Sequence, residues 1–198
     1  FPIAEHCILG KGLKMFQFRK TVANMIPAPM VRYFASPYVA GDSLEKGLDT
    51  ADRLFRDKRI LSTIDLLGEA EKTKDKVMVA VEAYEKTLDA IKDRPYASIS
   101  IKPGGFGYYV DPSFCRENIE RVAEKAQKQG TLLTVDMEDV DITDYTLKLY
   151  SELKPKYPVL GTVLQSRLFR TEKDIDLLDG LKAHVRLCIG IYFEPKTI

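Results

Sequence analysis

The sequence is poor in the residues that build disulfides and zinc sites. Its three cysteines, Cys7, Cys115 and Cys188, lie far apart in no CxxC pair, and His6 and His184 are its two histidines. This pattern argues against a disulfide framework and against a zinc site, and it favours a reducing compartment. We therefore predict a cytoplasmic protein without a metal centre.

The sequence also lacks an excess of either charge and any long apolar run. Its 198 residues include 30 basic and 29 acidic side chains, and 45% are hydrophobic. A net charge near zero argues against a nucleic-acid surface. No stretch has the length of apolar residues that a membrane-spanning helix needs. These features predict an ordinary globular protein with a sizeable core.

Residues 11–32 mix basic side chains with methionine and phenylalanine. Such a mixture could describe a helix lying at a membrane interface, which leaves peripheral membrane contact open. A leader helix packed on the body of the protein fits better, because the apolar positions are not clearly segregated on one face.

What is present is a regular alternation of short apolar segments and helical ones. A capping-box pattern, Asp42 and Glu45, predicts a helix that ends near Asp57. We predict strands at 61–67, 97–102, 131–136, 160–165 and 184–191, with helices between them at 74–92, 112–129, 142–154 and 171–182. Strands that each lead into one helix are typical of parallel βα units.

Alternate residues of these strands differ in polarity, which separates two kinds of parallel sheet. One set is almost wholly apolar, as in Ile99 and Ile101. The other set ends in polar side chains, one on each strand: Asp65, Lys102, Asp136, Gln165 and Arg186. A doubly wound sheet would bury both faces under helices. A polar inner face predicts instead the interior and mouth of a (β/α)8 barrel, where active sites of this fold lie.

The charged strand ends have a second interpretation, a buried ion network that only fixes packing. Such a network costs desolvation free energy and is weak support for stability, so we favour a functional site. We predict an α/β protein with a helical arm at residues 1–58 and the first part of a barrel at 59–198. Since a whole barrel has eight strands, the remaining strands would come from the same chain or another copy.

Five segments, one on each strand, resemble the proline dehydrogenase family. They are STIDLLGEA (62–70) after the capped helix GDSLEKGLDTADRL (41–54), SISIK (98–102), TVDMED (134–139), TVLQSRLFRTEKDI (162–175) and HVRLCIGIYFE (184–194). Each motif alone is weak, but together they follow the order and approximate spacing of that family's barrel.

The resemblance implies an FAD enzyme that oxidises L-proline to 1-pyrroline-5-carboxylate by hydride transfer and passes the electrons to a quinone. It implies proline catabolism in the cytoplasm, or in the mitochondrion of a eukaryote, and leaves peripheral contact with the inner membrane open.

The resemblance also assigns roles to residues. Lys102 resembles the family's carboxylate-binding lysine, and Asp136 resembles its strand-end acid that touches both flavin and substrate. Gln165 and Arg186 resemble partners of the isoalloxazine ring. Further residues match positions that line the flavin: Met137, Val163, Cys188, Gly190, Ile191 and Tyr192. Others match positions near the substrate: the gating acid Glu69, the inner-barrel acid Asp65, and Leu187 and Tyr192.

The last strand departs from the family pattern R-L-V-K-G-A-Y at Ile189 and Ile191. Ile191 adds bulk close to the expected flavin. This departure supports an alternative function, a catalytically inactive barrel relative or fragment that serves as a binding or assembly module. A barrel enzyme for phosphorylated substrates fits less well, because the usual phosphate site follows strands seven and eight.

Overall fold

The computed structural model describes residues 43–66 and 70–192, together with residues 27, 30, 34, 39–41 and 194. The chain divides into two compact units, residues 1–47 and 48–198, and helix α3 (Leu44–Lys58) crosses the division. The expected boundary between a helical arm and a barrel at residue 58 stays a prediction. The 11–32 segment, Asp42 and Glu69 lie outside the described residues, except for residues 27 and 30 of that segment.

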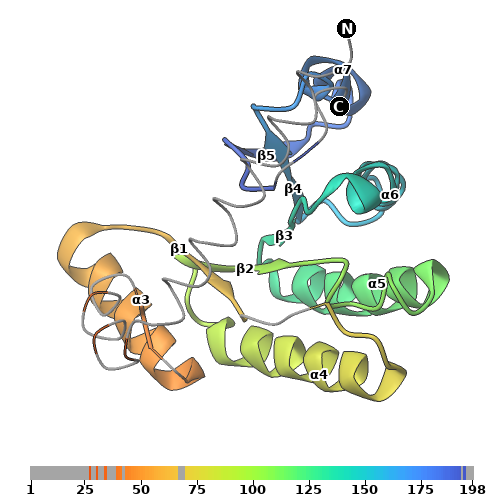
Figure 1. The fold of residues 1–198 in the computed structure, drawn as a ribbon. Helices are drawn as coiled ribbons and strands as arrows, with labels where there is room; N and C mark the ends of the chain where they lie inside the picture. Colours follow the sequence, from red (N-terminus) through yellow and green to blue (C-terminus); the bar gives the residue numbers. More distant parts are fainter. Residues whose placement is uncertain are drawn as a thin grey trace, which may run out of the picture. The chain divides into compact units, whose positions relative to one another are not determined.

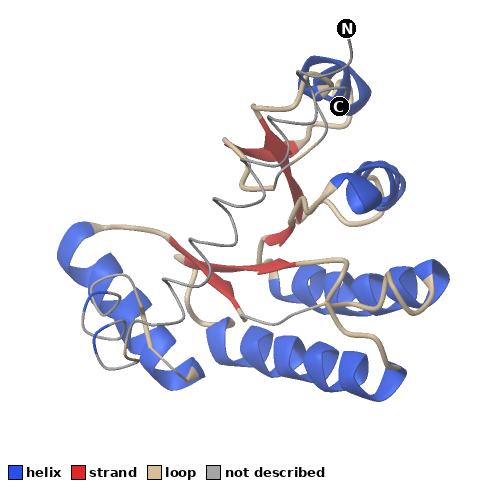
Figure 2. Ribbon diagram, in the orientation of Figure 1, coloured by secondary structure: helices blue, strands red, loops and turns tan. Residues whose placement is uncertain are grey.

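The second unit is a curved parallel sheet whose strands pair in chain order. The strands are β1 (Ser62–Asp65), β2 (Ala97–Ile101), β3 (Leu133–Val135), β4 (Leu160–Gln165) and β5 (His184–Cys188). Helices α4 (Lys74–Ile91), α5 (Pro112–Gln129), α6 (Val140–Leu153) and α7 (Thr171–Leu178) each follow one strand. Figure 1 shows α4, α5 and α6 along the outer side of the curve. Five strands with helices outside form a half-barrel, which confirms the predicted α/β class and barrel type (Figure 2).

Local sequence signals explain the helix ends. The Asp111 side chain accepts the Phe114 N–H at 2.9 Å, Pro112 opens α5, and Gly130 ends it with a left-handed backbone at φ 68°. Helix α6 is capped by Asp139, which places Asp141 in its first turn. Helix α7 ends at residue 178, short of the predicted 182. It stops early because Asp179 has an extended backbone at ψ 141°, and Gly180 and Lys182 beyond it adopt positive φ angles.

The core lies between the sheet and its helices. Apolar side chains of β2 and β3, including Ile99, Ile101 and Leu133, are fully buried. All six residues of β4 are buried, whereas all five residues of β5 are exposed. The strand alternation holds, because Thr63 and Ser98, neighbours in register on the polar face, join their hydroxyls at 3.0 Å. None of the described helices is long and apolar enough to cross a membrane.

Candidate active site

Four charged side chains form a row across the carboxyl ends of the strands. We call Asp65, Lys102, Asp136 and Arg186 the charged row. The Lys102 Nζ lies 2.5 Å from Asp65 Oδ2 and 3.8 Å from Asp136 Oδ2, and Arg186 Nη2 lies 2.7 Å from Asp136 Oδ1. Acid and base therefore alternate along the row. The parallel sheet builds this arrangement, because it brings the ends of successive strands to the same edge.

The Asp136 carboxyl is the most enclosed member of the row, with a side chain that is 12% exposed. Burial raises the pKa of Asp136, although the nearby positive charges of Arg186 and Lys102 act in the opposite direction. Desolvation therefore has the largest effect on this acid, although its partner Arg186 is half exposed.

A cavity of about 340 Å³ opens beside the row. Its walls come from the ends of β2, β3, β4 and β5 and from the segment after β5. Its lining residues are Lys102, Asp136, Met137, Val163, Gln165, Arg186, Cys188, Ile189, Gly190, Ile191 and Tyr192. All nine residues that the family resemblance assigns to the flavin are among them.

Gln165 lines this cavity and holds one acceptor without a partner in the described part of the chain. Its Nε2 donates to the Glu138 backbone oxygen at 2.9 Å, while its Oε1 is buried without a hydrogen-bond partner among the described residues. A Cβ at Gly190 would lie 2.3 Å from that oxygen, and Gly190 has φ +98°, so only glycine suits this position. An unpartnered acceptor and the Arg186 donors, which belong to residues lining the same cavity, fit a flat ring that carries both N–H and carbonyl groups.

Three predicted site residues are either largely exposed or outside the described residues. Leu187 does not line the cavity and is 62% exposed, because alternate side chains of β5 face opposite sides and its neighbours Arg186 and Cys188 face the cavity. The substrate contact at Leu187 stays a prediction. Ile191 lines the cavity but is 83% exposed. Glu69 lies outside the described residues, so its gating role stays a prediction.

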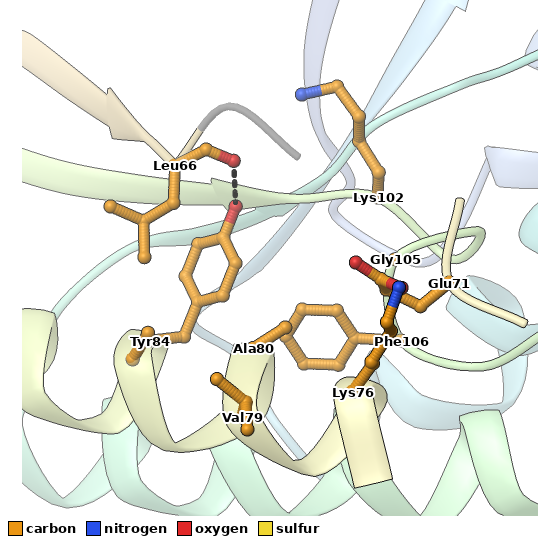
Figure 3. Close-up of a pocket in the computed structure, with 10 residues that line it drawn as sticks. Leu66, Glu71, Lys76, Val79, Ala80, Tyr84, Lys102, Gly105 and Phe106 are labelled. Carbon is orange, nitrogen blue, oxygen red and sulfur yellow. Dashed lines mark hydrogen bonds between the residues drawn. The ribbon is translucent and has the colours of Figure 1, made fainter. Parts of the chain in front are cut away.

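Sequence reasoning missed Tyr84 of α4. Its hydroxyl lies 3.3 Å from Asp65 Oδ1 and 3.4 Å from the Leu66 oxygen, and its ring packs against Phe106. Figure 3 shows Tyr84 reaching from the helix to Leu66, beside a second cavity of about 250 Å³. Burial, helped by the Asp65 charge, raises the pKa of Tyr84, so the phenol stays protonated. In the sequence it is one more apolar position of a helix, which hides the reach of its hydroxyl.

Comparison with known proteins identifies the family of this chain. A sequence profile described as proline dehydrogenase matches residues 48–192. The chain belongs to the proline dehydrogenase family. It is 30% identical over 180 residues to proline dehydrogenase 1 of Bacillus subtilis subsp. natto, covering 90% of this chain and 59% of that protein. It is 31% identical over 195 residues to proline dehydrogenase of Deinococcus radiodurans, covering 91% of this chain and 63% of that protein. The chain thus spans about three fifths of the length of these relatives.

Solved structures share the fold. Proline utilization A from Bdellovibrio bacteriovorus, inactivated by N-propargylglycine, superposes with a TM-score of 0.70 at 17% identity, covering 78% of this chain and 20% of that chain. A Bradyrhizobium japonicum proline utilization A mutant, D779Y, gives 0.61 at 21% identity, covering 77% and 18%. Part of each of those larger chains thus has the half-barrel fold seen here.

Proposed function

We propose that the protein oxidises L-proline to 1-pyrroline-5-carboxylate, with FAD as its bound cofactor and a quinone as its electron acceptor. One observation carries the proposal. The nine residues that match flavin positions of the family surround one cavity, together with the lysine that matches its carboxylate-binding residue. The remaining part of the barrel would close the opposite side of that cavity, supplied by the same chain or another copy.

The cavity residues suit the cofactor in kind. Arg186 would donate to the acceptor atoms of the isoalloxazine ring, and the unpartnered Gln165 Oε1 would accept an N–H from it. Val163 and Met137 offer apolar surface beside them. When bound, FAD would take up the hydride and later release two electrons to the quinone.

Lys102 suits the substrate. An ammonium group has three donors, and Asp65 occupies one of them at 2.5 Å. The Lys102 side chain is 30% exposed and lines the cavity, so it can also bind the carboxylate of proline. Proline loses a hydride from the carbon next to nitrogen that does not carry the carboxylate, and it loses a proton from nitrogen. These two losses leave the C=N bond of the product. Holding the carboxylate would fix that carbon toward the flavin side of the cavity.

The test uses the full-length protein. We expect flavin absorbance that bleaches on anaerobic addition of L-proline, and we expect Lys102→Ala to raise the KM for proline by about 10- to 100-fold, the effect of losing a charge-assisted hydrogen bond. Lys125→Ala is the matched control, because Lys125 also pairs with an aspartate, at 2.7 Å, but far from the cavity on α5. A lower Tm with unchanged proline kinetics in Lys102→Ala would leave the lysine a packing role only.

Exposed side chains after β5 support the second candidate, a non-catalytic relative that binds or assembles with a partner. Ile189 and Ile191 are 75% and 83% exposed, an apolar pair at the rim of the cavity. A full-length protein that is colourless, and that stays so after incubation with FAD, would favour this function over the oxidation of proline.

A further inference from the structure

Glu138 stands apart from the charged row, yet it contacts the same strand ends. Its carboxylate accepts the Gly104 N–H at 2.7 Å, and its backbone oxygen accepts the Gln165 Nε2 at 2.9 Å. The Gly104 oxygen in turn accepts the N–H of Glu71 at 3.3 Å. These bonds link the loops that follow β1, β2 and β3 with the end of β4.

The link reaches the loop that carries Lys102. The Lys102 backbone oxygen accepts N–H groups from Gly105 and Phe106, at 3.0 and 3.2 Å, so residues 102–106 form one tight turn. Within this turn the Gly104 N–H points to Glu138, and Glu71 lies beside the turn (Figure 3). The Glu138 carboxylate thus ties the middle of the turn to the loop after β3, in addition to the ion pair between Lys102 and Asp136 at its start.

Gly104 is shaped for this contact. A Cβ at Gly104 would lie 2.9 Å from Glu138 Oε1 and 3.1 Å from Oε2, so any side chain there would displace the carboxylate. Gly104 has no positive φ, so its backbone would accept alanine without strain. The space, and not the backbone conformation, requires glycine.

Packing alone gives a poor account of an acid here. No cation of the described residues forms an ion pair with Glu138, and burial raises the pKa of its carboxyl. A half-buried carboxylate that no cation pairs directly costs desolvation free energy. Its short bond to a backbone N–H offers a compensating role.

We propose that Glu138 is a positioning residue that holds the turn after β2 and thereby places Lys102 for the substrate carboxylate. The inference rests on the proposed function, since it concerns proline binding. It predicts that the KM for proline depends on the hydrogen bond that Glu138 accepts and not on the negative charge of its carboxylate.

Two substitutions in the full-length protein separate bond from charge. Glu138→Ala removes the acceptor and should raise the KM for proline by about tenfold, with kcat changed by less than about twofold. Glu138→Gln keeps an acceptor for the Gly104 N–H and should retain a KM within about twofold of the wild type. Equal damage from Gln and Ala would show that charge is what counts, which would overturn the proposal.

A third substitution approaches the contact from its other side. Gly104→Ala should displace the carboxylate and raise KM as Glu138→Ala does, and the double variant should be no worse than either single one. Additive effects would show that the two residues act independently and contradict the proposal. If Glu138→Ala does not fold, the Gln and Gly104 variants still decide the question.

The control is Asp139→Ala, the next acid in the chain. Asp139 caps α6 through the Asp141 N–H at 3.2 Å and is no part of the cavity lining. Its loss should lower Tm and leave KM unchanged.

Amide hydrogen exchange gives a readout that does not depend on turnover. Glu138→Ala should speed exchange at Gly104 and Gly105, whereas Glu138→Gln should not. If the wild-type protein does not oxidise proline, the proposed function fails and exchange alone decides whether Glu138 holds the turn. Unchanged exchange together with unchanged KM in Glu138→Ala would overturn the inference.

Discussion

Strands β4 and β5 are paired along five residues and differ in burial throughout. Leu164 of β4 is 3% exposed, while its partner in register, Leu187 of β5, is 62% exposed. Helices α6 and α7 contact β4, and within the described part of the chain no helix covers β5. Strand alternation decides which face a side chain joins, and the element lying on that face decides whether it is buried.

The same difference divides the cavity. Its first half, with Asp136, Val163 and Gln165, rests on strands held by helices on their far side. Its second half, with Arg186 and Ile191, stands on the uncovered strand. We expect substitutions in the first half to lower the stability of the protein. Substitutions in the second half should mainly weaken ligand binding.

The largest expected effect compares the two leucines directly in the 198-residue polypeptide. Leu164→Ala should lower the free energy of unfolding by about 2–5 kcal/mol, because it leaves a cavity in a packed site. Leu187→Ala should change it by less than about 0.5 kcal/mol, because the side chain is already in water. Urea denaturation of both variants checks this. Equal losses would mean that β5 is covered by a surface that the described residues do not show.

The second prediction concerns the uncovered half of the cavity in the full-length protein. Arg186→Met should weaken flavin retention roughly tenfold, the order expected for one lost charge-assisted hydrogen bond, or shift the flavin reduction potential. The barrel should still fold, since Lys102 remains as a cation beside Asp136 when Arg186 is replaced. Flavin absorbance per protein and a redox titration measure this.

Arg121→Met serves as the control for this arginine. Arg121 forms a two-point ion pair with Glu85 between α5 and α4, away from the cavity. Its loss should leave flavin content and potential as in the wild type. If both arginine variants behave alike, or if Arg186→Met changes none of these quantities, Arg186 has no place at the flavin.

The smallest expected effect is a pH dependence at Glu138, which bonds to Gln165 of the covered half. Burial raises the pKa of Glu138 above its ordinary 4.5, with Asp139 and Asp136 adding to the rise and the Gly104 N–H and Lys102 opposing it. The folded chain therefore holds this proton more tightly than the unfolded chain. The protonated Glu138 carboxyl therefore contributes to the stability of the folded chain below pH 4.5. This contribution is lost as pH rises through the raised pKa.

Glu138→Gln does not ionise, so its stability relative to the wild type should improve between about pH 4 and pH 7. Glu124→Gln should show the opposite sign at lower pH, because the Lys128 side chain lowers the pKa of Glu124, and the wild type loses this stabilisation only as pH falls below about 4.5. Tm measured from about pH 3 to pH 7 tests both signs. A Glu138→Gln curve parallel to the wild type would show that burial does not govern this carboxyl.

Much of the fold followed from the sequence because its signals are local. The capping aspartate, the opening proline and the closing glycine of α5 predict its bounds without any tertiary contact. The alternation along each strand likewise places Asp65, Lys102, Asp136 and Arg186 on one face, since it follows from backbone geometry alone. The family resemblance then supplied the flavin positions, which the structure gathers around one cavity.

Other features depend on how segments far apart in the chain meet. That Asp136 lies nearer to Arg186 than to Lys102 depends on the curvature of the sheet. That Tyr84 reaches Asp65 depends on how α4 packs, and that Glu138 meets Gly104 depends on the path of two loops. The sequence by itself determined the helix ends and the alternation of polarity along each strand, because these arise within a few residues. Only the tertiary structure decided the partners of those side chains and the burial of each strand, because both depend on what packs beside them.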